Sequence, residues 1–470
     1  MSNMRNLGSI NLPRQSNHAS ENSHEHVTTI AALATAPGKG AVAVIRVSGP
    51  DAAHVLAGLL PTRDKFPIRR ATLAKVYDYH QEVIDEVLVI YFHGPASFTG
   101  EDSFEIHPHG SPFIVQKLLA RLYELGCTPA KPGEFTRRAF LNGKMDLTAA
   151  EGIQQLVDSN SEHQWKAARQ LASGILKDHI EALRADIIGA MAYLEARIDF
   201  PDEGDVKGVE LDPIVDKVKA IDSSLVALEK SYDSGKIASS GLTVALIGAP
   251  NRGKSSLMNA ILKKNRAIVT DIAGTTRDYI EESCLVNGRL IRLIDTAGIR
   301  KTEETVEKIG VTASQEILKS ADVVLFVSAL DVEGAEDTTY LEGIDDAKII
   351  RVVNKYDLNF HYEPKPGEFP VSCISGAGLE SLKAELSARV DRSVATIGNQ
   401  AFISTPRHLH AIRQARKALQ GFFAGNEDGA FDEMLAFELQ SAVSQLSSVI
   451  GSVDHEDLLD KIFSDFCVGK

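Results

Sequence analysis

The chain has 470 residues, of which 44% are hydrophobic and 24% charged, a composition that indicates a globular protein of several domains and excludes a largely disordered chain. No run of 18 apolar residues occurs, so we expect no membrane-spanning segment. The formal net charge of −14, taken over the whole chain, argues against a nucleic-acid partner.

The N-terminal residues 1–26 are rich in Ser, Asn and His and lack the apolar stretch of a secretory signal, so we expect a disordered extension. The four cysteines lie far apart and form no C-x-x-C pair. We therefore expect neither a disulfide framework nor a zinc site. We do expect a cytoplasmic location.

Residues 27–147 mix short apolar runs with Gly and Pro breaks. The runs 41–47 and 83–91 predict strands, and 111–125 predicts an amphipathic helix. This region is therefore expected to be an α+β domain.

The pattern changes over residues 148–235, where apolar residues at spacings of three and four predict long helices. The clearest of these are 167–194 and 211–228. The stretch 231–241 is rich in turn residues and is interpreted as a linker.

Residues 236–390 contain near-continuous apolar runs, which are typical of parallel strands buried on both faces. The expected strands are 243–247, 290–294, 323–327 and 348–353. Residues 391–470 are helical again, with helices expected at 405–423, 432–450 and 456–466. We therefore predict a multidomain α/β plus α fold, in which the α/β domain is inserted into one discontinuous helical domain.

A phosphate-binding loop is predicted at residues 248–255, which fit the pattern G-x-x-x-x-G-K-[ST] between an expected strand and an expected helix. Backbone N–H groups of such a loop surround phosphate oxygens at the N-terminus of the helix. We expect Lys254 to reach the β- and γ-phosphates and the Ser255 hydroxyl to bind Mg²⁺.

Three further motifs follow expected parallel strands, at the edge where open α/β sheets bind ligands. The acidic residue of 295–298 can hold Mg²⁺ through water. Asp357, in 354–357, can accept both N1–H and N2–H₂ of guanine, which adenine does not offer. Residues 372–378 can close over the base. Together these motifs predict GTP as the ligand and a Ras-like P-loop GTPase domain.

The segment 270–278 fits a switch loop in which Thr276 is the second Mg²⁺ ligand. Ile299 stands where familiar GTPases use a Gln to orient water, so another group must do this. Arg252 and Arg277 are candidates to stabilise charge, or ordinary surface residues. The predicted GTP-binding residues are Asn251, Arg252, Gly253, Lys254, Ser255, Ser256, Thr270, Asp271, Ile272, Ala273, Gly274, Thr275, Thr276, Asp295, Thr296, Ala297, Gly298, Asn354, Lys355, Asp357, Ser372, Cys373 and Ile374.

Several motifs outside the nucleotide site resemble those of one family. They are residues 35–40, 45–50, 97–102, 105–110, 132–147 and 198–203, and the C-x-G-K ending 467–470. With them the chain resembles the MnmE (TrmE) family of tRNA-modification GTPases over nearly its full length. The resemblance implies a folate-binding α+β domain, a discontinuous helical domain and an inserted G domain.

The resemblance also implies a reaction. With an MnmG-type FAD-dependent partner, in a heterotetramer, the protein would add a carboxymethylaminomethyl or aminomethyl group to C5 of wobble uridine 34 in certain tRNAs. A reduced folate, 5-formyl- or 5,10-methylene-tetrahydrofolate, would supply the one-carbon unit. The positions that match folate-binding ones are Arg46, Glu105, Lys144 and Lys470. Cys467 is either a thiolate near the folate and uridine or a cysteine packed as a small hydrophobe.

The family members hydrolyse GTP as homodimers through their G domains and bind K⁺ beside the phosphates. A fixed cation there offsets the charge of the phosphoryl-transfer transition state. The matching K⁺ ligands are Asn251, Thr270, Ile272 and Thr275. Glu307 matches the carboxylate that orients water and is, with Cys467, an expected catalytic residue. Arg252 departs from the small residue that is usual at its position.

The charge is unevenly distributed, with −8 over residues 148–235, −4 over 391–470 and +1 over 27–147. The basic residues Arg137, Arg138 and Lys144 cluster in the last of these regions. The chain average therefore does not exclude tRNA. The alternative function is a ribosome-assembly GTPase acting as an RNA-binding switch, although no KH-type GXXG loop follows residue 390.

Overall fold

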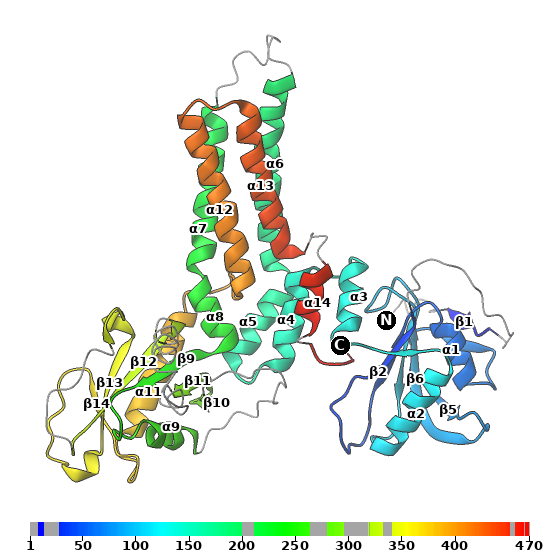
Figure 1. Ribbon diagram of the computed structural model, residues 1–470. Coiled ribbons are helices and arrows are strands. Elements are labelled where there is room, and N and C mark those ends of the chain that lie inside the picture. Colours follow the sequence, from blue (N-terminus) through cyan, green and yellow to red (C-terminus); the bar gives the residue numbers. More distant parts are fainter. Residues whose placement is uncertain are drawn as a thin grey trace, which may run out of the picture. The chain divides into compact units, whose positions relative to one another are not determined.

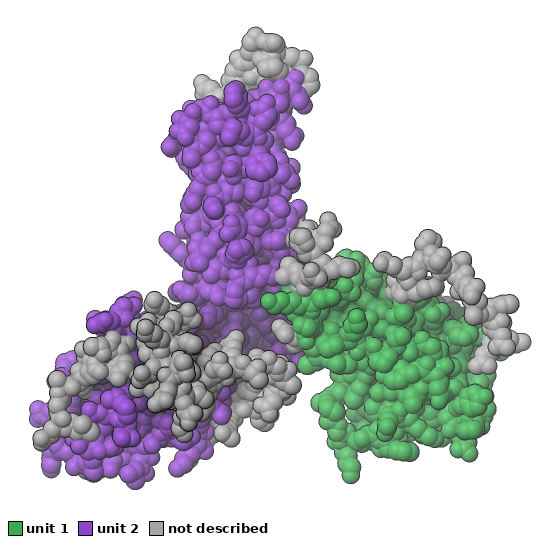
Figure 2. All heavy atoms as spheres, in the orientation of Figure 1, with its two compact units in different colours: residues 1–150, 453–470 green, residues 151–452 purple. Residues whose placement is uncertain are grey.

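The computed structural model describes residues 8–13, 28–199, 211–263, 280–295, 318, 320–331, 341–451, 456–464 and 466–469. The chain divides into two compact units, residues 1–150 with 453–470 and residues 151–452 (Figure 2). Most of their helices and strands are labelled in Figure 1. None of the helices in the described ranges has the length and apolar character that a membrane crossing requires.

A six-stranded mixed sheet forms the centre of the N-terminal unit, in the order β5-β6-β7-β3-β2-β8. Its strands are β2 (Ile30–Leu33), β3 (Ile45–Ser48), β5 (Thr72–Tyr77), β6 (Val83–Phe92), β7 (Ser103–His107) and β8 (Thr128–Pro129). The helices α1 (Ala52–Leu59) and α2 (Pro112–Glu124) pack with the sheet in one core, which includes Val47, Leu118 and Ile106. Because side chains alternate along a strand, the neighbouring Arg46 and Glu105 lie on the opposite face.

The expectation that residues 1–26 are disordered is wrong for residues 9–11. These form strand β1 (Ser9–Asn11), which pairs antiparallel with β4 (Lys65–Pro67). Ile10 packs against the N-terminal core and Leu12 is buried in it, so apolar contacts hold this short strand. The other residues of the extension, 1–7 and 14–26, lie outside the described residues.

The last helix, α14 (Glu456–Ser464), belongs to the N-terminal unit by its contacts. It packs against α3 (Glu134–Leu141), and a small core forms among Leu147, Ala150, Leu459, Phe463 and Phe466. The sequence pattern had grouped this helix with the helical residues 391–450.

One core joins the helices on either side of the inserted domain, as the predicted discontinuous helical domain requires. These helices are α6 (Ile175–Asp199), α7 (Asp212–Lys230), α12 (Pro406–Glu427) and α13 (Asp432–Ile450). The single helix predicted over 167–194 is wrong. Gly174, with φ 85°, separates α5 (Glu162–Ala172) from α6.

The stretch 231–241 is not a linker but contains helix α8 (Tyr232–Ser240). A Cβ at Gly235 would lie 2.2 Å from the carbonyl oxygen of Ile403, so glycine permits close packing here. The Ser239 hydroxyl donates to the Gly235 carbonyl at 2.9 Å, a bond within the helix. Small polar residues that indicated a turn thus serve tertiary packing.

A buried ion cluster connects α4 (Leu147–Asp158) to α12. Glu151 lies 2.9 Å from Arg407 Nη2 and 2.8 Å from His408 Nε2. Arg407 also donates to the carbonyl of Ser448 in α13, at 2.6 Å. Burial alone would raise the pKa of Glu151, but the charges of His408 and Arg407 outweigh it, and the pKa lies below its usual value of 4.5.

We expect Glu151→Gln to lower the free energy of unfolding by about 2 kcal/mol at neutral pH, because the amide loses charge-assisted hydrogen bonds to Arg407. The native carboxyl stabilises the fold above its unfolded pKa, and this contribution disappears as pH falls through the lower native pKa. The difference between the two proteins should therefore shrink on acidification. Urea unfolding followed by circular dichroism, at several pH values, measures it. A constant difference down to pH 3 would contradict the assignment.

The second sheet has the order β10-β11-β9-β12-β13-β14 and is parallel except for the hairpin β10–β11. Its strands are β9 (Leu242–Ile247), β10 (Ile280–Val286), β11 (Arg289–Asp295), β12 (Val323–Ala329), β13 (Ile349–Asn354) and β14 (Glu368–Pro370). Every residue of β9 is buried, as its apolar run predicted. The helices α9 (Lys254–Leu262) and α11 (Leu379–Val394) share a core with this sheet. The carboxyl ends of the central strands meet at one edge, where the predicted motifs follow.

Candidate nucleotide-binding site

The phosphate loop connects β9 to α9 and is folded into a tight cradle. Gly253 has φ 88°, and a Cβ there would lie 2.1 Å from Nδ2 of Asn354, so glycine is required. Lys254 is buried, and its ammonium donates to the carbonyls of Gly248 and Ala249 at 2.8 and 2.9 Å. The loop thus holds a desolvated cation at a helix N-terminus, which fits a bound polyphosphate.

Two of the residues predicted to hold Mg²⁺, Ser255 and Asp295, are brought together, whereas Thr276 lies outside the described residues. The Ser255 hydroxyl donates to Oδ2 of Asp295 at 2.7 Å, and Asp295 is buried at the end of β11. A hydroxyl and a carboxylate are hard oxygen donors, which Mg²⁺ prefers. The residues present therefore fit the ion.

The buried amide of Asn354 joins the phosphate loop to the base-binding segments. Its Nδ2 donates to the Arg252 carbonyl at 3.0 Å, and its Oδ1 accepts from the Lys355 amide at 2.8 Å and from Cys373 Sγ at 3.3 Å. The side chain of Asn354 therefore links the phosphate loop to the segments 354–357 and 372–374.

Asp357 is oriented by a neighbouring hydroxyl. Ser372 Oγ donates to its Oδ1 at 2.5 Å, and Asp357 lies in the 3₁₀ helix η4 (Tyr356–Leu358), which follows β13. The segments 354–357 and 372–374 are therefore held as one unit. A carboxylate fixed in this way suits the two donors of guanine. Ile374 is exposed beside it.

Arg252, a departure from the expected small residue, supports the loop. Its Nη1 donates to the Ala329 carbonyl at the end of β12, at 3.2 Å. Lys355 and Asp331 form an ion pair nearby. The hydrogen bond from Lys355 holds the pKa of Asp331 below its usual range, and the charge of Arg252 acts in the same direction.

We expect Arg252→Ala to weaken GTP and GDP binding about five-fold each, because one hydrogen bond that fixes the loop against β12 is lost, at a cost of about 1 kcal/mol. The affinities for the two nucleotides should fall equally, because the Arg252–Ala329 hydrogen bond fixes the loop itself and does not depend on the γ-phosphate. Titration with fluorescent analogues of both nucleotides measures it. Unchanged affinity, or an effect on GTP alone, would contradict this role.

Several predicted site residues lie outside the described residues. They are Thr270, Asp271, Ile272, Ala273, Gly274, Thr275, Thr276, Thr296, Ala297, Gly298, Glu307 and Lys470. The switch loop, three of the four K⁺ ligands and the water-orienting carboxylate therefore stay predictions. Of the described ones, Asn251 takes a positive φ of 61° in the loop, and Ser256 is exposed in the first turn of α9.

A second candidate site lies on the face of the N-terminal sheet that is opposite its main core. Arg46 and Glu105 are paired across β3 and β7, and Nε of Arg46 lies 2.9 Å from Oε1 of Glu105. His107 Nε2 lies 3.3 Å from Oε2 of the same carboxylate. The sequence analysis did not name His107, although its place two residues after Glu105 on one strand was a usable signal.

The C-terminal tail reaches this second site. Arg46 Nη1 donates to the Gly469 carbonyl at 3.4 Å, and Gly133 N donates to the Cys467 carbonyl at 3.3 Å. A Cβ at Gly469 would lie 2.3 Å from the Leu33 carbonyl oxygen, so only glycine fits the C-x-G-K ending here. Cys467 is exposed. Lys144 donates instead to the Pro95 carbonyl, at 2.8 Å.

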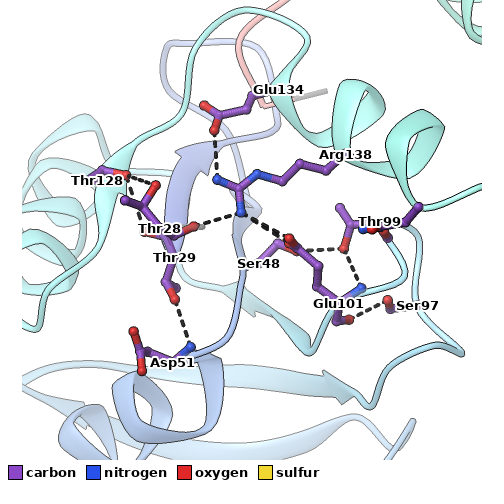
Figure 3. A network of polar contacts seen from close by, with 11 residues as sticks. Thr28, Thr29, Ser48, Asp51, Ser97, Thr99, Glu101, Thr128, Glu134 and Arg138 are labelled. Carbon is purple, nitrogen blue, oxygen red and sulfur yellow. Dashed lines mark hydrogen bonds and ion pairs between the residues drawn. The ribbon is translucent and has the colours of Figure 1, made fainter. Parts of the chain in front are cut away.

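The predicted basic cluster is largely engaged in internal contacts. Arg138 binds Glu134 at 2.8 Å, Glu101 at 3.2 Å and the Thr28 carbonyl at 2.7 Å (Figure 3). Its side chain is only 11% exposed. Arg137 pairs with Asp460 of α14 at 3.5 Å. These arginines hold α3 in place rather than presenting a free basic surface.

A cavity of about 570 Å³ opens between residues 33–43 and α2. Thr35, Lys39, Gln116 and Tyr123 contribute polar groups to a mainly apolar lining. Arg46 and Glu105 are not among its lining residues, so the N-terminal unit offers two separate places for a ligand.

Comparison with known proteins agrees with these features. Two family profiles match the chain, one described as GTP-binding protein TrmE N-terminus over residues 29–144 and one as MnmE helical domain over 147–467. A protein of Aquifex aeolicus named tRNA modification GTPase MnmE is 39% identical over 447 residues, covering 94% of this chain and 99% of the relative. Its counterpart in Thermotoga petrophila is 38% identical over 456 residues, covering 94% and 100%.

Among solved structures, the G domain of the T. maritima FeoB iron transporter is 26% identical. It covers 31% of this chain and 97% of that chain, with a TM-score of 0.24.

Proposed function

The chain belongs to the MnmE family of tRNA modification GTPases, and on this premise we propose a K⁺-stimulated GTP hydrolase that modifies wobble uridines. With an FAD-dependent partner of the MnmG type, it adds a carboxymethylaminomethyl or aminomethyl group to C5 of uridine 34 in certain tRNAs. The observation that carries the GTPase part of the proposal is that Lys254, Ser255, Asp295 and Asp357 all lie at or just after the carboxyl ends of parallel strands of one sheet.

In the GTP reaction the chain supplies a preorganised set of charges. Lys254 is buried and would contact the β- and γ-phosphates of a bound nucleotide, and Ser255 and Asp295, which are hydrogen-bonded to each other, would hold Mg²⁺. Asn251, with Thr270, Ile272 and Thr275, binds K⁺, and Glu307 orients the attacking water. A cation at that place offsets the charge that develops as the phosphoryl group is transferred.

The second site is proposed to bind the reduced folate that donates the one-carbon unit. Glu105 suits the hydrogen-bond donors of a pterin, and Arg46, Lys144 and Lys470 suit its glutamate carboxylates. The contact of Arg46 with the Gly469 carbonyl supports this, because it brings the tail that carries Cys467 to the same face.

The assembly is proposed to be a homodimer through the G domains, and a heterotetramer with the FAD-dependent partner, in the cytoplasm. The helical residues of this chain are acidic, so we propose that the partner supplies much of the basic surface that binds tRNA.

We expect K⁺ to speed GTP hydrolysis at least about ten-fold over Na⁺ at equal ionic strength, a conservative value for a preorganised charge at the transferred phosphate. Phosphate release from the purified full chain measures this. Equal rates in the two salts would contradict the proposed K⁺ site.

The modification is tested by mass spectrometry of tRNA nucleosides. Deletion of the gene should remove the C5-modified wobble uridine, and the wild-type gene should restore it. A variant with Arg46→Ala should restore it poorly while keeping GTP hydrolysis. An unchanged nucleoside profile with altered ribosome profiles would overturn the proposal in favour of a ribosome-assembly GTPase.

A further inference from the structure

Glu105, on strand β7, is held by two donors that reach its two carboxylate oxygens separately. Nε of Arg46 donates to Oε1 at 2.9 Å, and Nε2 of His107 lies 3.3 Å from Oε2. An ionised carboxylate only accepts hydrogen bonds, so the imidazole is the donor and carries a proton on Nε2. Turning the carboxylate plane would therefore break at least one of the two bonds.

The sheet register brings these side chains together. Glu105 and His107 are two residues apart on β7, so they point to the same face of the sheet. Arg46 is the direct partner of Glu105 on β3. On the other side, β6 supplies the apolar partners Ile90 for Glu105 and Leu88 for His107. An aliphatic neighbour offers no competing hydrogen bond, so the register favours the contact between imidazole and carboxylate.

Arg46 alone does not hold the whole carboxylate. Its guanidinium is divided between two partners, because Nη1 donates to the Gly469 carbonyl at 3.4 Å while Nε donates to Oε1 of Glu105. His107 supplies the donor at the second oxygen, Oε2. The imidazole therefore adds the contact that turns a single attachment into a fixed orientation.

The carboxylate of Glu105 keeps acceptor capacity for a ligand. Its two oxygens offer about four lone-pair positions, of which Arg46 and His107 use one each. The Glu105 side chain is 23% exposed, so a ligand can reach it. A fixed carboxylate with one free position on each oxygen suits a ligand that presents two adjacent N–H donors.

We propose that His107 is a positioning residue of the folate site, which orients Glu105 to accept from N3–H and the 2-amino group of the pterin ring. A carboxylate that is oriented before binding loses little freedom when the ligand arrives, and this raises the affinity. His107 acts through Glu105 and does not need to touch the folate. The inference rests on the folate binding of the proposed function.

The test measures binding of 5-formyl-tetrahydrofolate to the full chain by isothermal titration calorimetry. His107→Ala should weaken binding about five-fold, because the freed carboxylate must be ordered by the ligand at a cost of about one hydrogen bond. His107→Gln, whose side-chain amide also donates, should bind within about two-fold of wild type. No loss in His107→Ala, or an equal loss in both variants with native circular dichroism, would overturn the role.

A double-variant comparison separates positioning from a general effect on the fold. If His107 acts through Glu105, adding His107→Ala to Glu105→Gln should cost no further affinity, whereas additive losses would overturn the inference.

His109→Ala is the matched control, since His109 lies two residues further along the chain and contacts Asp85 instead, at 2.9 Å. It should bind as wild type, and a loss equal to that of His107→Ala would also overturn the role. A wild-type chain that does not bind 5-formyl-tetrahydrofolate would instead overturn the proposed folate site.

Discussion

Replacing Asp357 with Asn is expected to lower GTP affinity by about 10²- to 10⁴-fold and to create affinity for XTP. In the proposed site the native carboxylate accepts two hydrogen bonds from guanine, and hydrogen bonds to a charged group contribute about 1.5–3 kcal/mol each. The amide N–H of Asn would face an N–H donor of guanine, which is unfavourable. The same N–H can instead donate to the O2 carbonyl of xanthine. Competition titration with GTP, XTP and ATP measures the change.

The control for this exchange is Asp345→Asn, the same chemical change in the same domain. Asp345 caps the 3₁₀ helix η3 (Asp346–Lys348) by accepting from the Ala347 amide, a role that Asn also performs. It should leave both affinities unchanged. A variant at Asp357 that loses GTP without gaining XTP, while its circular dichroism is native, would show that this carboxylate does not read the base.

The nucleotide domain could be predicted well because its strands are buried on both faces. The run Leu242–Ile247 is apolar throughout, so it is distinguished from an amphipathic strand or helix by its sequence alone. The phosphate-loop pattern then fixed where that strand ends. Once the strands were ordered in a parallel sheet, Ser255, Asp295 and Asp357 had to meet at one edge.

Helix α8 and the break at Gly174 could not be predicted, because a small residue can either end a helix or permit close packing within one. Gly235 permits α8 to approach Ile403, whereas Gly174 ends a helix with a positive φ. Nothing local distinguishes the two. The partner of Gly235 lies 168 residues away in the chain, so only the folded helical region reveals it.

The charged residues of the N-terminal unit show the same limit. Arg138 looked like part of a basic surface, yet Glu101 and Glu134 neutralise it in the fold. His107 passed unnoticed, yet it lies beside Glu105. Whether a charged side chain is available depends on partners that are remote in sequence, which a pattern over a short window does not contain.

Replacing Lys254 with Ala is expected to reduce GTP binding by about 10³-fold and to abolish measurable hydrolysis. The ammonium is buried and already bonded to the carbonyls of Gly248 and Ala249, so phosphate binding costs little further desolvation. In the proposed site its loss removes charge-assisted contacts to two phosphates, each of about 1.5–3 kcal/mol. Lys263→Ala, an exposed lysine just after α9, is the control and should bind normally.

Comparing GTP with GDP tests whether the Lys254 ammonium contacts both the β- and the γ-phosphate. A lysine that spans the β- and γ-phosphates loses one contact with GDP, so Lys254→Ala should weaken GDP binding less than GTP binding, by about ten-fold or more between the two. Equal losses would mean that the ammonium acts only on the β-phosphate or only on the shape of the loop. Near-wild-type GDP affinity together with GTP hydrolysis would exclude this loop as the phosphate site.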